Sequence, residues 1–380
     1  MTTWQYMTRF ACLGGDCEDT CCASWGVEVS EDAAARIEEA VGEPRTREMI
    51  AFYAEQHRTP ERCGRIRMPA YQTCTMLNGQ GMCSLQMDHG EAVLPRTCVS
   101  YPRSLSHHGT HQELGGFLSC PEVARQALLK DDALEAVDAP LPEMRMNPDQ
   151  TIDREGAYFD LRAEVSAALS ELGRGRPLAE RLWLLSRLGA MSVARFSRST
   201  TDPAPIRALL TEFQDTGYQD AIVSELADST RPTFDDALLG ALRILGEDIG
   251  RYLKPRAHVA AALATIDSEG LEAGRERWPA LETTLSGALD NYIRFHFLSR
   301  WYTESPDLGS HIENMLLKLA LLRLLLRTAP ADTPPDEVLI TAVYSIDRMV
   351  EHDAWRFQCK ALVRAAGGDY FTQLGDWIRF

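Results

Sequence analysis

The sequence FACLGGDCEDTCCASW, residues 10–25, opens the run of cysteines around which the chain is organised. Nine of the ten cysteines lie between residues 12 and 120. Free cysteines usually behave as small buried hydrophobic residues, and such residues scatter along a chain, whereas these cluster beside glycines and turns. We therefore predict that they form a site. The clustered residues are Cys12, Cys17, Cys21, Cys22, Cys63, Cys74, Cys83, Cys98 and Cys120.

Length and compartment favour a metal site over a disulfide framework. At 380 residues the chain can bury a core without disulfide or metal staples. Residues 1–10 lack the basic and apolar segments of a secretory signal, so we expect a cytoplasmic protein. In a reducing compartment, clustered cysteines are more often metal-binding or catalytic than disulfide-bonded.

The ligand types favour an iron–sulfur cluster first and zinc second, because thiolates select soft metals and no histidine stands at zinc-finger spacing. Cys21 and Cys22 are adjacent, and adjacent side chains point in different directions. One of the two could therefore bind a second metal or pack as a plain thiol. We expect Cys63 and Cys359 to be buried or incidental. The spacing suggests two groups of four ligands, Cys12, Cys17, Cys21 and Cys22, and then Cys74, Cys83, Cys98 and Cys120.

Residues 1–125 are rich in glycine, cysteine and proline, which predicts a loop-rich module organised by its ligands. One helix is predicted over residues 30–40, with Ser30 as its N-cap. Another should follow Ser119 and Glu122, which have the spacing of a capping box, with Pro121 in its first turn. Cys120 would then lie at a helix N-terminus, a position that favours thiolate.

The rest of the chain has helical periodicity. Residues 126–155 contain several prolines and predict a linker or irregular wrap, and residues 156–380 predict a helical domain. The expected fold class is mainly α, with a loop-rich cysteine and metal-binding N-terminal module docked on a C-terminal helical bundle. Apolar stripes predict helices over 178–188, 233–249, 281–301, 311–327 and 336–351.

Charge and hydropathy limit the partners. A net charge of −16 argues against nucleic acid, which needs a basic footprint. The most apolar stretch, residues 315–326, is interrupted by Lys318 and Arg323. It is also shorter than the roughly 20 residues that span a bilayer, so we expect no membrane partner.

Several short motifs surround the cysteines in a fixed order along the first 125 residues. They are Phe10-x-Cys12, Cys17-Glu18-Asp19-Thr20-Cys21-Cys22-x2-Trp25, Cys83-Ser84-Leu85, Leu94-Pro95-x2-Cys98-x2-Tyr101-Pro102-Arg103 and Leu118-Ser119-Cys120-Pro121-Glu122-x-Ala124-Arg125. Together these motifs resemble the flagellin lysine-N-methylase family. The resemblance continues weakly through Asn291-Tyr292 and Arg348-x2-Glu351-His352, whereas much of residues 130–280 matches only in helical character.

The resemblance implies a cytoplasmic enzyme that uses a [4Fe-4S] cluster and S-adenosylmethionine to methylate lysine side chains, with flagellin as the substrate. Two common motifs are missing. No glycine-rich strand-to-helix turn of a Rossmann methyltransferase is present. The Cys-x3-Cys-x2-Cys motif of radical enzymes is also incomplete. Cys17 and Cys21 match its first two cysteines, but Ser24 stands at the position of the third. The cluster could therefore be a scaffold closed by four thiolates, or a three-thiolate site that chelates the donor.

Polar residues near the cysteines are the candidates for catalysis and donor binding. Tyr101 and Glu113 are predicted as catalytic residues, and Arg103 or Arg125 as the group that holds a carboxylate of the cofactor. Arg125 could equally form a surface pair with Glu122. Three histidines on a predicted loop, His107, His108 and His111, and the pair Glu351-His352 are weaker candidates.

Two other functions fit the same residues. The acceptor could be a small-molecule amine instead of a protein lysine. Alternatively, the protein could be a non-enzymatic zinc- or iron-binding scaffold.

Overall fold

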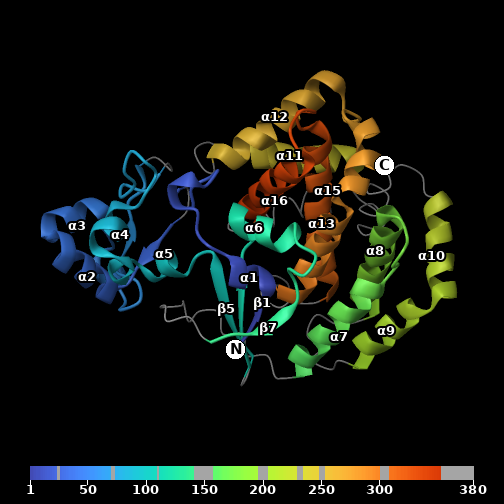
Figure 1. Ribbon diagram of the computed structural model, residues 1–380, viewed down its shortest axis with the longest axis horizontal. Coiled ribbons are helices and arrows are strands. Elements are labelled where there is room, and N and C mark those ends of the chain that lie inside the picture. The colour runs from blue at the N-terminus through green and yellow to red at the C-terminus, as the bar shows by residue number, and fades with distance from the viewer. Residues whose placement is uncertain are drawn as a thin grey trace.

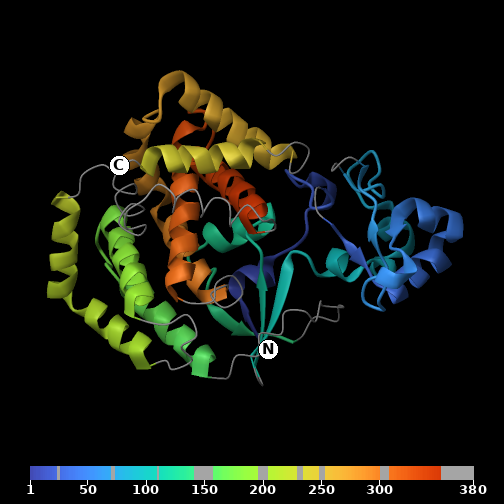
Figure 2. The same cartoon turned by 180° about the vertical axis from the view of Figure 1, so that it is seen from behind.

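The computed structural model describes residues 1–351 except 24–25, 70–72, 109–110, 141–156, 196–203, 229–233, 248–252 and 300–307. It is mainly helical, and a small lobe, residues 27–100, lies beside a large helical lobe (Figure 1). The view from behind shows the same division (Figure 2). The predicted fold class, a cysteine-rich N-terminal module docked on C-terminal helices, is confirmed.

The small lobe has its own hydrophobic core, in which Val29, Ile37 and Ile50 are fully buried. Its three strands are antiparallel in the order β2-β4-β3. Ser30 occupies the N-cap position of α2, as predicted, but its hydroxyl donates to the Asp32 carboxylate and makes no cap bond to the backbone. The elements are β2 (Glu28–Val29), α2 (Glu31–Val41), α3 (Glu43–Met49), β3 (Ile50–Phe52), η2 (Glu55–His57), β4 (Gly64–Ile66), α4 (Ser84–His89), η4 (Glu91–Val93) and α5 (Arg96–Ser100).

A second sheet, in the order β5-β6-β1-β7, joins the start of the chain to the large lobe. The first strand runs parallel to β6, with Thr2 opposite Glu113, and antiparallel to β7. Its neighbour Tyr6 is fully buried, and the Tyr6 hydroxyl accepts the Gly116 N–H at 3.0 Å. The elements are β1 (Thr2–Trp4), α1 (Gln5–Arg9), η1 (Gly14–Asp16), β5 (Arg103–His108), β6 (His111–Gly116), α6 (Pro121–Leu128) and β7 (Ala136–Asp138).

Two local predictions were wrong. The residues His107, His108 and His111 belong to the antiparallel hairpin of β5 and β6 instead of a loop. The capping box before α6 does not form, because the N-cap residue is Cys120 and no side-chain cap bond is made. The chain enters α6 one residue later than the Ser119–Glu122 spacing implied.

The predicted helices of the large lobe are confirmed. Their ends differ from the predicted ranges by a few residues, except that α8 extends seven residues beyond residue 188. The helices are α7 (Ala157–Glu171), α8 (Leu178–Arg195), α9 (Ala204–Gln214), α10 (Thr216–Asp228), α11 (Phe234–Glu247), α12 (Leu253–Glu269), η6 (Arg275–Arg277), α13 (Trp278–Ser299), α15 (Leu308–Thr328) and α16 (Pro335–Glu351).

Helix α15 is the centre of the large lobe and is buried from Leu308 to Arg327. A helix covered on all sides must pair any charge it carries. Lys318 accordingly lies 2.7 Å from Asp347 of α16, and both side chains are almost fully buried. Among the described residues, no helix is long and apolar enough to cross a membrane.

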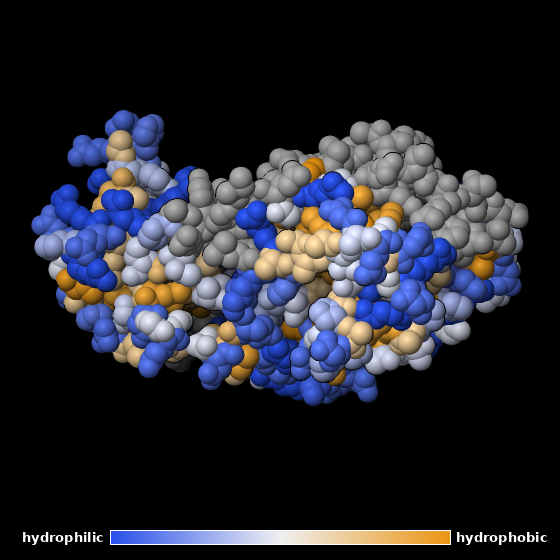
Figure 3. All heavy atoms as spheres, turned by 90° about the horizontal axis from the view of Figure 1, so that it is seen from above, coloured by the Kyte–Doolittle hydropathy of each residue, from blue (hydrophilic) through white to orange (hydrophobic). Residues whose placement is uncertain are grey.

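On the face seen in Figure 3, the described residues present many hydrophilic side chains with scattered apolar patches among them. This distribution agrees with the net charge of −16. The exposed large hydrophobic side chains among the described residues include Leu13 and Met87, which flank the cysteine-bearing turns, and Val193 on α8.

Candidate thiol site

The clustered thiols come from several separate segments that meet between the two lobes. Cys21 and Cys22 follow the η1 turn, Cys98 lies on α5, and Cys120 begins α6. The Cys74 N–H donates to the Cys22 carbonyl at 2.7 Å, which fixes these two backbones side by side. A bridge between Ala23 and Thr73 extends this contact. Cys74 is thereby held beside a segment about fifty residues earlier in the chain.

The thiols are close enough to influence one another's ionisation. Burial raises the pKa of Cys98 above its usual range, and the charges of Cys74, Cys83 and Cys21 raise it further. The pKa of Cys22 is raised chiefly by its hydrogen bond to Cys21 and by burial, with Cys98 and Cys74 adding to the effect. These five thiols therefore face a common region, and this proximity crosses the two groups suggested by chain order.

A neighbouring group of thiols contains Cys120, which is buried. Burial raises the pKa of Cys120 to about 12, although hydrogen bonds from the backbone of Val123 and Glu122 lower it. Charges on Cys17 and Cys21 raise it further. The helix terminus thus acts in the direction we expected, but desolvation outweighs it, and the metal-free protein holds Cys120 as a thiol.

Cys21 interacts both with the thiols around Cys98 and with Cys120, and it is the most acidic of these thiols. Its pKa is lowered to about 7, chiefly because Cys22 donates a hydrogen bond to the Cys21 thiolate. Arg348 also favours the thiolate. The exposed Cys12 stands apart from this pair, and its Sγ accepts the Gly14 N–H at 3.4 Å.

Arg348 is a residue of this site that sequence reasoning did not single out. It is 6% exposed on α16. Its Nη1 lies 2.5 Å from Asp19 and donates to the Thr20 carbonyl at 3.1 Å. Its Nε and Nη2 donate to the Ser119 carbonyl at 3.2 and 3.0 Å. The guanidinium therefore joins the residues just before Cys21 to the residue just before Cys120. The motif that contains Arg348 was the available signal, but it did not reveal partners more than two hundred residues away.

Two further cations reach the same loop from other helices. Arg125 of α6 pairs with Glu18 and also lies 2.5 Å from Glu122. Lys254 of α12 donates to the Glu18 carbonyl. The alternative role that we gave Arg125, a pair with Glu122, is thus present together with a second contact. In this acidic chain, three cations from three helices surround residues 18–20.

The predicted catalytic residues lie in different environments. The Tyr101 hydroxyl is 3.1 Å from the Ser119 Oγ, and the ring stacks on Phe117. Burial raises the pKa of Tyr101 above its usual range, while Arg348 opposes the shift. Glu113 lies on β6, where Arg162 of α7 binds its carboxylate through both ends of the guanidinium fork. Tyr101 adjoins the thiols through Ser119, whereas Glu113 is committed to a buried ion pair.

The other predicted residues are placed as follows. The Arg103 guanidinium stacks over the Phe10 ring, with 5.0 Å between its Cζ atom and the ring centroid. Cys63 is buried in the small-lobe core, as expected. Glu351 ends α16, and both His352 and Cys359 lie outside the described residues.

The donor chemistry of the clustered thiols fits a thiolate-binding metal centre. Several neighbouring thiols raise one another's pKa, and a bound cation would relieve that repulsion. All described cysteines are free thiols. Within the described ranges, no three or more His, Cys, Asp or Glu side chains lie together so that they could hold a metal ion as placed. Metal binding would therefore need the sulfur atoms to turn about their Cα–Cβ bonds.

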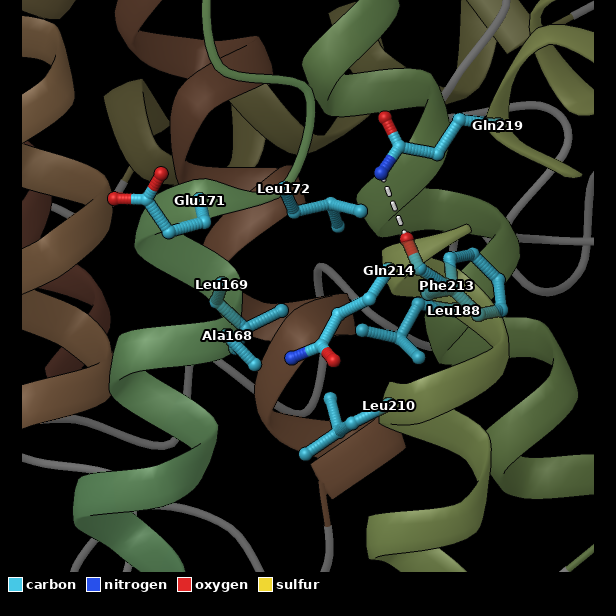
Figure 4. Close-up of a pocket in the computed structure, with 9 residues that line it drawn as sticks. All are labelled: Ala168, Leu169, Glu171, Leu172, Leu188, Leu210, Phe213, Gln214 and Gln219. Carbon is cyan, nitrogen blue, oxygen red and sulfur yellow. Dashed lines mark hydrogen bonds between the residues drawn. The ribbon is translucent and has the colours of Figure 1, made fainter. Parts of the chain in front are cut away.

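A separate cavity of about 70 Å³ lies among α7, α8, α9 and α10 (Figure 4). Apolar side chains such as Leu169 and Leu210 line it, and Gln219 donates to the Phe213 carbonyl at its edge. It has room for a few water molecules only. The cavity is too small for S-adenosylmethionine, and no clustered thiol lines it.

Comparison with known proteins found partial similarity to lysine-N-methylases. The chain is 28% identical over 150 residues to the lysine-N-methylase of Salmonella typhimurium, covering 37% of this chain and 36% of that protein. The lysine-N-methylase of Salmonella choleraesuis is 27% identical over the same length. The flagellar biosynthetic protein FliU of Salmonella muenchen is 28% identical over 135 residues, covering 34% of this chain and 77% of that protein.

The similarity is limited in extent. The matched part spans little more than a third of the two lysine-N-methylases. No known family profile matches the chain. No solved structure matches it either. The protein is a distant and partial relative of the lysine-N-methylases.

Proposed function

We propose that this protein is an S-adenosylmethionine-dependent N-methyltransferase that acts on lysine ε-amino groups and carries a [4Fe-4S] cluster. The observation that carries the proposal is the similarity to two lysine-N-methylases. The gathered thiols support it, because a chain of this length does not need so many cysteines to fold. The cluster and the methyl donor are both parts of the proposal.

The residues proposed to hold the cluster are four neighbouring thiols, Cys22, Cys74, Cys83 and Cys98. Cys74 and Cys98 raise the pKa of Cys22, and Cys74 and Cys83 raise the pKa of Cys98, so the four would supply a closed set of thiolates. A cluster with four thiolates acts as a scaffold, whereas one with three offers an open iron position for the donor's amino and carboxylate groups. We favour the scaffold because spare thiols are at hand. Arg103 or Arg125 would then take the donor's carboxylate.

Methyl transfer requires a neutral lysine amine. The nitrogen lone pair forms the new N–C bond as the donor's S–C bond breaks, and S-adenosylhomocysteine leaves. We assign Tyr101 to orient the amine through a hydrogen bond to its phenolic oxygen, while water takes the released proton. Tyr101 suits this role better than Glu113, whose carboxylate is already bound by Arg162.

Flagellin is the proposed acceptor. One relative is named a flagellar biosynthetic protein, and this supports a flagellar substrate. A lysine-rich surface would also be attracted by a chain with a net charge of −16. If no methyl group is transferred to flagellin, a small-molecule amine becomes the proposed acceptor.

The test is an anaerobic preparation of the full chain, incubated with methyl-labelled S-adenosylmethionine and purified flagellin. We expect a brown protein with iron and sulfide in near-equal amounts and label on flagellin lysines. Cys98→Ser should lose most of the metal and the activity. Cys63→Ser, which alters a thiol in the small-lobe core, should retain both. A colourless protein with stoichiometric zinc and no transfer to flagellin or to free lysine would contradict the proposal.

A further inference from the structure

We infer that Arg348 is a positioning residue through which the large lobe fixes the loop bearing Cys21 against the turn bearing Cys120. It rests on the proposed function and deepens it, because Cys21 precedes the proposed cluster ligand Cys22, and Cys120 follows Ser119, which contacts the proposed amine-binding residue Tyr101. The inference itself concerns the placement of the two thiol-bearing segments, which can be measured without metal or methyl donor.

The contacts of Arg348 are divided between the two segments. One nitrogen, Nη1, serves Asp19 and the Thr20 carbonyl. The other two, Nε and Nη2, converge on the Ser119 carbonyl. Only a planar fork with donors along two edges can serve both segments at once. The thiols of Cys21 and Cys120 follow directly after these anchored residues.

The burial of this network makes it costly to break. Both the Arg348 and the Asp19 side chains are 7% exposed, and Ser119 is fully buried. A buried charge that loses its partner is strongly destabilising. Removing the guanidinium would leave the Asp19 carboxylate and the Ser119 carbonyl without this donor, so the two segments should separate.

Two other cations from the described helices contact the same loop in a different way. Arg125 and Lys254 also hold the loop, but their contacts are to Glu18, at the exposed side of the loop. Neither contact reaches Ser119. The groups that face Arg348 are Asp19, Tyr101 and Cys21 from the cysteine-rich region and Tyr344 from its own helix.

The first experiment measures thiol alkylation in the reduced, metal-free full chain. In Arg348→Met, we expect the buried Cys120 to be alkylated about tenfold faster relative to Cys63, because local opening exposes its thiol. Cys63 is an internal reference in the small-lobe core. Arg348→Lys keeps the charge but loses the planar fork, so it should protect Cys120 little better than Arg348→Met does.

The matched control is Arg323→Met. Arg323 is a similarly buried arginine on α15, where it stacks on Trp278, with 4.7 Å between its Cζ atom and the ring centroid. This variant should lower global stability without changing the alkylation ratio. Unchanged ratios in Arg348→Met, an equal rise in Arg323→Met, or full protection in Arg348→Lys would each overturn the inference.

A second experiment adds cobalt(II) ions to the same proteins and follows thiolate-to-cobalt charge-transfer absorption. Substituting a residue that orients the metal ligands without binding the metal itself typically weakens metal affinity by about 10–100-fold. We expect such a loss in Arg348→Met but not in Arg323→Met, and equal affinities in the two variants would count against the inference. If the wild-type protein binds no metal through its thiols, the proposed cluster fails, and the alkylation result still decides the role of Arg348.

Discussion

At the scale of single residues, burial decides what an arginine–glutamate pair contributes. Arg162 binds both oxygens of Glu113, and the two side chains are 8% and 7% exposed. Arg207 binds both oxygens of Glu164 in the same way, at 2.6 and 2.7 Å, but these side chains are 43% and 48% exposed. We predict that Arg162→Met costs about 3–5 kcal/mol of unfolding free energy. Arg207→Met should cost at most about 1 kcal/mol.

Chemical denaturation of the two variants measures this difference. It also tests the proposed catalytic role of Glu113. If the pair is structural, Glu113→Gln should lower the stability before it lowers the activity per folded molecule. If Glu113→Gln keeps the wild-type stability but loses activity, Glu113 is a catalytic residue as the sequence predicted.

The thiols offer a second prediction at the residue scale. Thiolate is the reactive species, so alkylation accelerates as the pH rises through a thiol's pKa. In the metal-free protein we expect Cys21 to reach half its maximal rate near pH 7, while Cys120 stays unreactive at neutral pH. Cys22→Ala removes the hydrogen-bond donor and should move the Cys21 midpoint to higher pH. Cys22→Ser keeps a hydroxyl donor and should move it less; an unmoved midpoint in both variants would exclude this cause.

At the scale of elements, helices were predictable and strand partners were not. The long helices have apolar stripes that repeat every three or four residues, so α8, α13 and α15 follow from local sequence. Strand β1 has three residues, and its partner in β6 lies 111 residues away by the Thr3–Leu114 hydrogen bond. Such short strands carry no periodicity, and their pairing depends on packing of the whole lobe. The thiols were found from composition, but their neighbours depend on the same long-range pairing.

In helix α13, Asn291 of the Asn291-Tyr292 motif makes a structural contact with α6. The buried Asn291 donates from Nδ2 to the carbonyls of Leu128 and Lys130, at 3.1 and 2.9 Å. It thereby satisfies backbone groups at the C-terminal end of α6, the helix that begins with Cys120.

We predict that Asn291→Ala lowers the free energy of unfolding by about 1–3 kcal/mol, because two carbonyls lose their donor. Thiol labelling should also show Cys120 less protected. The control is Thr283→Ala on the exposed side of the same helix, where Thr283 bonds only to the Pro279 carbonyl. It should change stability by no more than about 0.5 kcal/mol. Equal effects of the two substitutions in thermal or chemical unfolding would contradict this role.

At the scale of the whole molecule, two separate hydrophobic cores meet at the thiol site. The small-lobe core draws on residues 27–99, and the larger core includes residues 4–10 together with the long helices. The domain boundary that we predicted near residue 125 remains a prediction, but the two cores show which residues share a packing unit. The first strand and helix pack with the large lobe, although the cysteine run begins only a few residues later.

The two cores predict two unfolding transitions in the metal-free protein. Small domains bury a lower fraction of their surface and are less stable, so the small lobe should unfold at a lower urea concentration. Trp4, Trp183 and Trp278 report on the larger core, and Cys63 alkylation reports on the smaller one. A Trp25→Phe background removes the tryptophan that follows Cys22 by three residues in the sequence. Reconstitution with iron and sulfide should raise the Cys63 midpoint toward the tryptophan midpoint, because ligands from both lobes would then be bound together. Coincident midpoints without metal would show that the lobes already unfold as one unit, and an unmoved Cys63 midpoint after reconstitution would show that the small-lobe thiols hold no metal.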